Sequence, residues 1–207
     1  MSITRRAFVK GTASASVTAS LAAAGYHVGR AAESSKVKFG QIGTKHAHAP
    51  GKIGTTRKFS DLYEVVGVVE PDDARWQQIA NSSPYKGVKR MTQEQLLNTP
   101  GLQVVAVETE VRGLLDVAEK CIAAGKHIHL DKPAGESLSH FKRILDAATR
   151  QGLTVQMGYM YRYNPAFQLA FRAKREGWLG HVFEVHTEMS KKIGAASRKR
   201  LAEYPGG

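Results

Sequence analysis

Short apolar runs alternate along this chain with segments of helical character, and this alternation constrains the fold more than any other feature. The runs at 63–70 and 102–109 are apolar almost without interruption, as expected for strands that are covered on both faces. Strands linked by helices favour a parallel sheet with helices on both of its sides. We therefore predict an α/β fold built on a doubly wound parallel sheet.

The expected strands cover residues 37–43, 63–70, 87–90, 102–109, 127–130 and 153–159. The expected helices cover 72–80, 92–97, 112–124, 137–150 and 164–177. We interpret residues 50–61 as a long link.

After Tyr159 the character of the sequence changes. Apolar and polar residues alternate over 181–189, with Phe183, Val185 and Met189 on one side, which predicts a strand with one buried face. The segment that follows offers no partner strand. We therefore expect a first domain over 33–160 and the incomplete start of a second α/β domain, with an open sheet, over 161–207.

The first 32 residues resemble an export signal. They contain the pair Arg5–Arg6, then a weakly apolar run rich in alanine, serine and threonine, and then small residues near Ala31. The run is shorter and more polar than a membrane span, which needs about 20 predominantly apolar residues. We predict a twin-arginine signal in 1–32, read by the twin-arginine export machinery, and hence a periplasmic location. A disordered basic N-terminus is the alternative.

Charge and cysteine content say little about a partner. The chain has 30 basic and 18 acidic residues, a net charge of +12, and four of the basic residues lie in the first 32. The rest are spread out apart from a cluster at 191–200, which could bind an anionic surface. Without a zinc-finger spacing or an aromatic-basic motif, nucleic acid is not expected. Cys121 is the single cysteine, so no intramolecular disulfide can form.

Polar or glycine-rich segments follow the predicted strands where each one ends. Because ligands of open parallel sheets bind beyond the carboxyl ends of the strands, these segments predict one ligand-binding crevice. Pro133 restricts Lys132 to extended backbone geometry, so the direction in which the lysine side chain leaves the backbone is defined. The candidate ligand-binding residues are Gly40, Gly43, Thr44, Lys45, His46, Glu70, Thr109, Asp131, Lys132 and Pro133.

Two of these positions suggest a dinucleotide. Gly40 and Gly43 let the backbone approach a pyrophosphate, although the second and third glycines of a full fingerprint are missing. Glu70 can accept hydrogen bonds from both ribose hydroxyls and would repel a 2′-phosphate, which favours NAD over NADP. A helix-capping role is the alternative for Glu70, and a solvated strand end is the alternative for Lys132.

The motifs "VKFGQIGT", "VVGVVEPDDAR", "VVAVET", "AAGKHIHLDKP" and "GYMYRYNP" occur in an order that resembles the Gfo/Idh/MocA family of nicotinamide-dependent oxidoreductases. "AGKHIHLDKP" is similar to the family's "AGKHVLVEKP", its most specific short motif. The resemblance covers about residues 36–189. It implies a Rossmann domain, and then an α/β domain whose open sheet faces the cofactor and often forms a homo-oligomer. It also implies NAD as cofactor and a sugar- or polyol-like substrate.

The resemblance also implies roles for single residues. Gly43 and its neighbours would hold the pyrophosphate, and Thr109 would lie on the nicotinamide side. Lys132 would orient the substrate hydroxyl and help to move its proton, a role that suits a buried lysine. Asp131 stands where the family has glutamate, and Lys45 where it usually has glycine. Two further positions, Arg162 and Asn164, match a polar stretch near the substrate.

The family's catalytic histidine follows a glycine pair early in the second domain, and this sequence ends in such a pair, Gly206–Gly207. We therefore expect the chain to stop before the general base and to lack normal turnover. A non-catalytic dinucleotide-binding module, or partner subunit, is the alternative function.

Two His-x-His pairs, His46/His48 and His127/His129, raise the question of a metal. No matched cluster of carboxylates or thiolates accompanies them in the sequence, so we predict no metal site. His127 and His129 share a strand face and are expected to pack or cap there.

Overall fold

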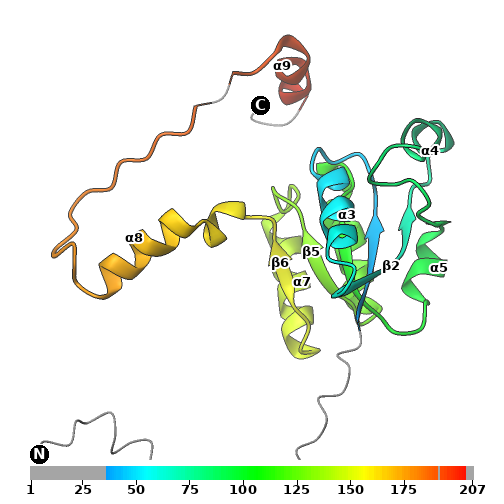
Figure 1. Ribbon diagram of the computed structural model, residues 1–207, viewed down its shortest axis with the longest axis horizontal. Coiled ribbons are helices and arrows are strands. Elements are labelled where there is room, and N and C mark those ends of the chain that lie inside the picture. Colours follow the sequence, from blue (N-terminus) through cyan, green and yellow to red (C-terminus); the bar gives the residue numbers. More distant parts are fainter. Residues whose placement is uncertain (1–35, 191, 204–207) are drawn as a thin grey trace, which may run out of the picture. The chain divides into compact units, whose positions relative to one another are not determined.

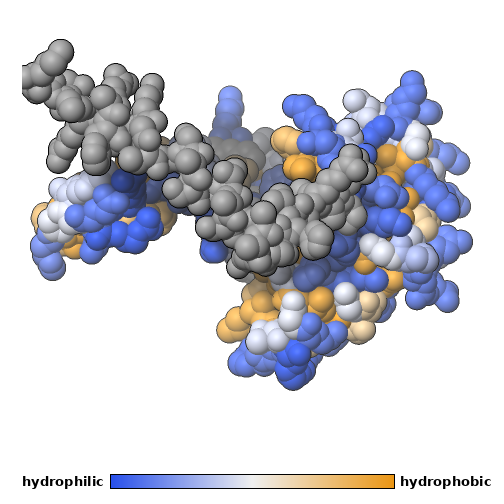
Figure 2. Space-filling view, turned by 60° about the horizontal axis from the view of Figure 1, so that its bottom comes forward, coloured by the Kyte–Doolittle hydropathy of each residue, from blue (hydrophilic) through white to orange (hydrophobic). Residues whose placement is uncertain are grey.

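The structure, a computed structural model, describes residues 36–190 and 192–203. The predicted signal at 1–32 and the terminal glycine pair lie outside these residues. The chain divides into two compact units between Gly158 and Tyr159. Among the described residues, no helix has the length and apolar character that a bilayer span requires. Hydrophilic residues cover much of the visible surface of the larger unit, with hydrophobic residues scattered among them (Figure 2).

The larger unit is built on one six-stranded sheet in the order β3-β2-β1-β4-β5-β6 (Figure 1). Each pair of neighbouring strands is parallel. The order reverses between β1 and β4, and such a reversal opens a crevice at the carboxyl ends of the strands. The predicted doubly wound parallel sheet is therefore confirmed. The strands are β1 (Val37–Ile42), β2 (Tyr63–Val69), β3 (Arg90–Met91), β4 (Leu102–Val107), β5 (His127–Leu130) and β6 (Val155–Met157).

Two hydrophobic clusters cover the two faces of this sheet. Because neighbouring residues of a strand point to opposite faces, Val105 and Val107 belong to one cluster and Ala106, between them, to the other. The first cluster includes residues of α5, α6 and α7, and the second includes Ile53 of α3. The helices of this unit are α3 (Ala49–Lys58), α4 (Asp73–Ile79), α5 (Gln93–Leu97), α6 (Leu114–Ala123, after the 3-10 turn η1, Val111–Gly113) and α7 (Leu138–Arg150).

Helix α3 corrects the sequence analysis, which predicts a link over 50–61. Gly51 and Gly54 lower the helix propensity of the segment, and its apolar residues show little helical periodicity. Pro50 fits the first turn, where no intrahelical donor is needed. The helix is stabilised by tertiary packing, because Ile53 is fully buried in the cluster that covers β1, β2 and β4.

The smaller unit contains the 3-10 turn η2 (Met160–Tyr163), α8 (Pro165–Arg175) and α9 (Ala195–Ala202). The strand predicted over 181–189 is wrong, because these residues have no regular secondary structure. Phe183, Val185 and Met189 are all at least three-quarters exposed. A strand needs a hydrogen-bonding neighbour, and the described residues of this unit provide none.

Candidate functional site

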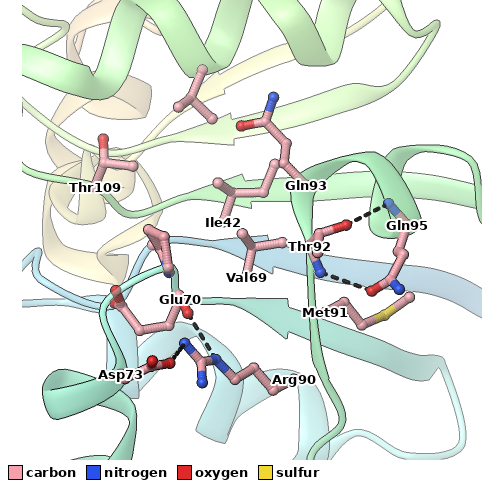
Figure 3. A pocket seen from close by; sticks show the side chains of 13 residues that line it. Ile42, Val69, Glu70, Asp73, Arg90, Met91, Thr92, Gln93, Gln95 and Thr109 are labelled. Carbon is pink, nitrogen blue, oxygen red and sulfur yellow. Dashed lines mark hydrogen bonds and ion pairs between the residues drawn. The ribbon is translucent and has the colours of Figure 1, made fainter.

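A pocket of about 550 Å³ lies at the carboxyl ends of β1, β2 and β4, where the strand order reverses (Figure 3). Three of the candidate residues line it together: Gly43 after β1, Glu70 after β2 and Thr109 after β4. Its other lining residues are Ile42, Val69, Pro71, Asp73, Arg90, Met91, Thr92, Gln93, Gln95 and Val117.

Gly43 occupies a position that only glycine fits. Its φ is +88°, in the left-handed region, and an added Cβ would lie 2.7 Å from the Thr109 amide nitrogen and 2.8 Å from the Glu108 carbonyl oxygen. The chain leaving β1 therefore crosses directly over the end of β4. This close crossing leaves the backbone at Gly43 and Thr109 on the wall of the pocket.

Gly40 has a packing role in the fold. It lies inside β1 and lines neither this pocket nor the smaller one beside it. An added Cβ would meet Leu96 Cδ1 at 2.8 Å. Its missing side chain thus lets α5 pack closely on the sheet, and its part in dinucleotide binding stays a prediction.

Glu70 is buried, with 3% of its surface exposed, yet it borders the pocket. One carboxylate oxygen accepts a hydrogen bond from the Thr44 hydroxyl, and the other accepts one from the Asp72 amide at 3.0 Å. The cap of α4 is Asp72, which accepts from the Arg75 amide. Glu70 therefore orders the turn before this helix but does not cap it.

Arg90 is a pocket residue that the sequence analysis missed. Its Nε donates to the Glu70 carbonyl at 2.8 Å, and its Nη2 lies 2.7 Å from Asp73 Oδ1, as Figure 3 shows. The guanidinium also lies over the Trp76 ring, 5.8 Å from its centre. Only its place at the end of the strand predicted over 87–90, "GVKR", could have indicated it, and in the structure it begins β3.

Lys45 lines a smaller pocket of about 180 Å³ that also includes Gly43, Thr44 and Glu70. Its ammonium lies 3.6 Å from Asp72 Oδ2, and both side chains are more than two-fifths exposed. The backbone hydrogen bond from Arg75, and then the Lys45 charge, lower the pKa of Asp72. An exposed pair of this kind is weak, so the lysine is free to turn towards an anion.

Lys132 and Pro133 follow β5, and the peptide bond between them is cis. The Lys132 amide donates to Asp131 Oδ1 at 2.7 Å, and its carbonyl lies 3.1 Å from His46 Nε2. Two side chains thus hold the backbone of Lys132 on both sides of its Cα. The side chain itself is exposed, so the burial expected for it is not found.

His46 lines neither of these two pockets, and its ring lies beside the residues that follow β5. Its Nδ1 lies 3.5 Å from both Glu108 Oε2 and Asp131 Oδ2, and His48 Nδ1 lies 3.0 Å from the same Asp131 oxygen. Interaction with Glu108 raises the pKa of His46 against the opposing effect of burial. Burial raises the pKa of Glu108 in turn.

Asp131 is fully buried at the centre of this group. Burial alone would raise its pKa, but the Lys132 amide, His48 and the nearby cations together lower it. The prediction of no metal site assumed that no carboxylates accompany the histidines, and this premise is wrong, because Glu108 and Asp131 lie beside them.

A family described as "Oxidoreductase family, NAD-binding Rossmann fold", Gfo/Idh/MocA, matches residues 37–159. This match covers more than half of the chain and the whole sheet that carries the pocket. The chain belongs to the Gfo/Idh/MocA family.

Individual Gfo/Idh/MocA relatives agree with this assignment. The chain is 30% identical over 94 residues to "Uncharacterized oxidoreductase YhhX" of Escherichia coli strain K12, covering 45% of this chain and 27% of that protein. It is 28% identical over 119 residues to "scyllo-inositol 2-dehydrogenase (NAD(+))" of Bacillus subtilis strain 168, covering 56% and 34%. The chain thus spans about a third or less of the length of these relatives.

The fold is also that of solved structures. The WlbA dehydrogenase of Bordetella pertussis, in complex with NADH and UDP-GlcNAcA, superposes with a TM-score of 0.62 at 20% identity. This comparison covers 72% of the present chain and 45% of the WlbA chain.

The two predicted substrate residues of this Gfo/Idh/MocA chain lie in the smaller unit. Arg162 is part of η2, where its amide donates to the Tyr159 carbonyl at 3.2 Å. Asn164 caps α8 by accepting from the Ala166 amide at 2.9 Å. The capping role accounts for Asn164 without a substrate, and the predicted substrate contacts of both residues stay predictions.

Proposed function

We propose that this protein is an NAD(H)-dependent oxidoreductase acting on a sugar- or polyol-like substrate. The observation that carries the proposal is the pocket of about 550 Å³ in which Gly43, Glu70 and Thr109 meet at the reversal of strand order. Dinucleotides bind at this place in doubly wound sheets. The relative named as an inositol dehydrogenase and the WlbA complex with a sugar nucleotide support the substrate class.

Glu70 supports NAD over NADP. Its buried carboxylate borders the pocket, where it would accept hydrogen bonds from the ribose hydroxyls and repel a 2′-phosphate. Arg90 is the nearby cationic group that could bind this 2′-phosphate. Its guanidinium is already engaged by Asp73 at 2.7 Å and by the Glu70 carbonyl, so the carboxylate determines the preference.

Gly43 and Lys45 would bind the pyrophosphate. The absent side chain of Gly43 leaves the backbone open to the ligand, and Lys45 supplies a partly exposed cation in the adjoining small pocket. Releasing Lys45 from Asp72 costs little, because an exposed ion pair contributes only about 0–1 kcal/mol.

Lys132 would handle the proton of the reaction. The bound nicotinamide would accept a hydride as the substrate hydroxyl loses its proton, or would supply a hydride as the substrate carbonyl oxygen gains one. Asp131 and His46 fix the backbone of Lys132, so its ammonium is presented from a defined point at the sheet edge. A positioned lysine can orient the hydroxyl and take part in this proton transfer.

A non-catalytic dinucleotide-binding module is the second candidate. Among the described residues, the Lys132 side chain forms no hydrogen bond or ion pair with a second acid or base. Binding of NAD(H) without conversion of any sugar or polyol would favour this candidate over the oxidoreductase.

Calorimetric titration with NAD⁺ and NADP⁺ tests the proposal. We expect the chain to prefer NAD⁺, and Glu70→Ala to weaken its binding about tenfold or more, because hydrogen bonds to charged groups contribute about 1.5–3 kcal/mol. Glu94→Gln, an exposed acid outside the pocket, is the control and should bind NAD⁺ normally. Equal affinity for both dinucleotides, or unchanged binding by Glu70→Ala, contradicts the proposal.

We also propose export by the twin-arginine route, on the strength of Arg5–Arg6 and the small-residue run that follows. A reporter fused after residue 35 should reach the periplasm. The double variant Arg5→Lys/Arg6→Lys should leave it in the cytoplasm, and equal export of both fusions would refute this part.

A further inference from the structure

Unpartnered buried polar atoms gather at one place beneath α3. Among the described residues, four buried side-chain atoms have no hydrogen-bond partner: both carboxylate oxygens of Glu108, Nε2 of His129 and Oε1 of Gln41. Ligand atoms of Glu108 and His129 lie within 4.8 Å of each other. Buried polar groups are nearly always satisfied, so such a concentration points to an ion or water that completes the site. The sequence and family comparisons assign no role to these residues.

The sheet itself brings two carboxylates together here. Ala106 of β4 is paired with His129 of β5, and Glu108 and Asp131 each lie two residues further on, just past the ends of these neighbouring strands. Since side chains alternate between faces, both carboxylates point to the α3 side. Neither is exposed to solvent. Two adjacent buried carboxylates repel each other unless a cation lies between them.

The start of α3 adds two imidazoles to the carboxylates. His48 Nδ1 lies 3.0 Å from Asp131 Oδ2, and His46 Nδ1 lies 3.5 Å from this oxygen and from Glu108 Oε2. Metal–ligand bonds of about 2.0–2.2 Å in a tetrahedral site place ligand atoms about 3.3–3.6 Å apart. The 3.5 Å separation between His46 Nδ1 and Asp131 Oδ2 fits an edge of such a tetrahedron, whereas the 3.0 Å between His48 Nδ1 and Asp131 Oδ2 is a hydrogen bond that would lengthen by a few tenths of an ångström.

His46 is also oriented as metal-binding histidines are. Its Nε2 lies 3.1 Å from the Lys132 carbonyl, an arrangement in which Nε2 donates and Nδ1 keeps its lone pair. A histidine ligand commonly donates its other ring nitrogen to a carbonyl in this way. The Nδ1 lone pair accepts a hydrogen bond from the His48 amide at 3.3 Å, which an ion bound at Nδ1 would replace.

We propose that Asp131, His46 and His48 bind one divalent transition-metal ion, of the class represented by Zn²⁺, with Glu108 beside it, its Oε2 3.5 Å from His46 Nδ1. Imidazole and carboxylate ligands suit zinc and its neighbours in the first transition row. The ion balances the two buried carboxylates. It also fixes the Lys132 backbone, because Asp131 and His46 each hold one side of that residue.

Lys52 is the protein cation that competes with this ion. Its ammonium lies 3.6 Å from Asp131 Oδ2. The side chain is long and about one-quarter exposed, and it borders a second pocket of about 470 Å³ that includes His129. It can therefore withdraw into this space when the ion binds. A proton on His46 is the other competitor for the place between the carboxylates.

Zinc titration of the chelator-treated, dialysed chain tests the site. We expect one Zn²⁺ per chain by calorimetry, and a Co²⁺ adduct with the intense visible absorption of a four-coordinate ion. His48→Ala, whose side chain is 37% exposed and so safe for folding, should weaken Zn²⁺ binding at least about 100-fold. Asp131→Asn should do the same, and circular dichroism verifies that each variant is folded.

The matched control is His181→Ala/His186→Ala, which removes two exposed histidines from the smaller unit. It should bind Zn²⁺ and Co²⁺ as the unmodified chain does. Failure to bind Zn²⁺ at a 1:1 ratio, or equal affinity of folded His48→Ala and the unmodified chain, overturns the proposal. Because the readout is the metal alone, this result is independent of whether NAD binds.

Discussion

Gly43→Ala should destabilise the protein more than its single added carbon suggests. The φ of +88° costs a non-glycine residue about 1–2 kcal/mol. The new Cβ would also lie 2.7–2.8 Å from backbone atoms of Glu108 and Thr109, which belong to the end of a central strand and cannot move aside. Overpacking of this kind costs about 1–3 kcal/mol. The two effects together predict a loss of about 2–5 kcal/mol.

Urea denaturation followed by circular dichroism measures this loss. With a typical slope of about 2 kcal/mol per molar urea, the midpoint should fall by about 1–2.5 M. Gly54→Ala is the matched control, because a methyl group added to this helical glycine would have nothing within 4 Å beyond its own helix. It should gain about 0.5–1 kcal/mol from the better helix propensity of alanine. A Gly43→Ala midpoint within about 0.3 M of the unmodified chain, an amount close to the experimental error, would refute the close approach of Gly43 to the backbone of Glu108 and Thr109.

Two further predictions concern the core and the cysteine. Leu130→Ala should lower the free energy of unfolding by about 2–5 kcal/mol, because this side chain is fully buried between β4 and the helices; a urea midpoint equal to that of the unmodified chain would contradict the packing. Burial raises the pKa of the Cys121 thiol from its ordinary 9.0 to about 12, so it should react with a thiol reagent only after unfolding. Since the unfolded thiol ionises first, the Cys121 contribution to stability should decline between pH 9 and about 12, and Cys121→Ala should show less of this decline.

The sheet could be predicted because its signals are local. The runs at 63–70 and 102–109 are apolar on both faces, and the helices between the strands carry recognisable caps. Ser137 accepts from the His140 amide at the start of α7, as its position in the sequence indicates. The strand ends alone also predict that Gly43, Glu70 and Thr109 share one crevice, and these three residues line the same pocket.

Two secondary-structure predictions were wrong because the structure of these segments depends on tertiary contacts. Helix α3 has two glycines and weak periodicity, and only its packing through Ile53 makes it a helix. The segment 181–189 alternates as a strand does, yet alternation cannot form a strand without a partner among the described residues.

The buried acid and histidine group could not be foreseen for a different reason. Glu108 and His46 are 62 positions apart, and their meeting depends on the register of β4 against β5 and on the start of α3. In the sequence Glu108 is one polar residue of the motif "VVAVET" at a strand end, and nothing there shows that it will meet His46. Even the pairing of Ala106 with His129, which brings Glu108 beside Asp131, is specified only by the folded sheet.

A crystal structure of the chain grown with NADH would show directly whether the pocket at the end of β1 binds the dinucleotide. We expect the adenosine ribose within hydrogen-bonding distance of Glu70, the pyrophosphate beside Gly43 and Lys45, and the nicotinamide near Thr109 and the Lys132 ammonium. A dinucleotide bound elsewhere on the protein, or bound here with its ribose away from Glu70, would contradict this expectation.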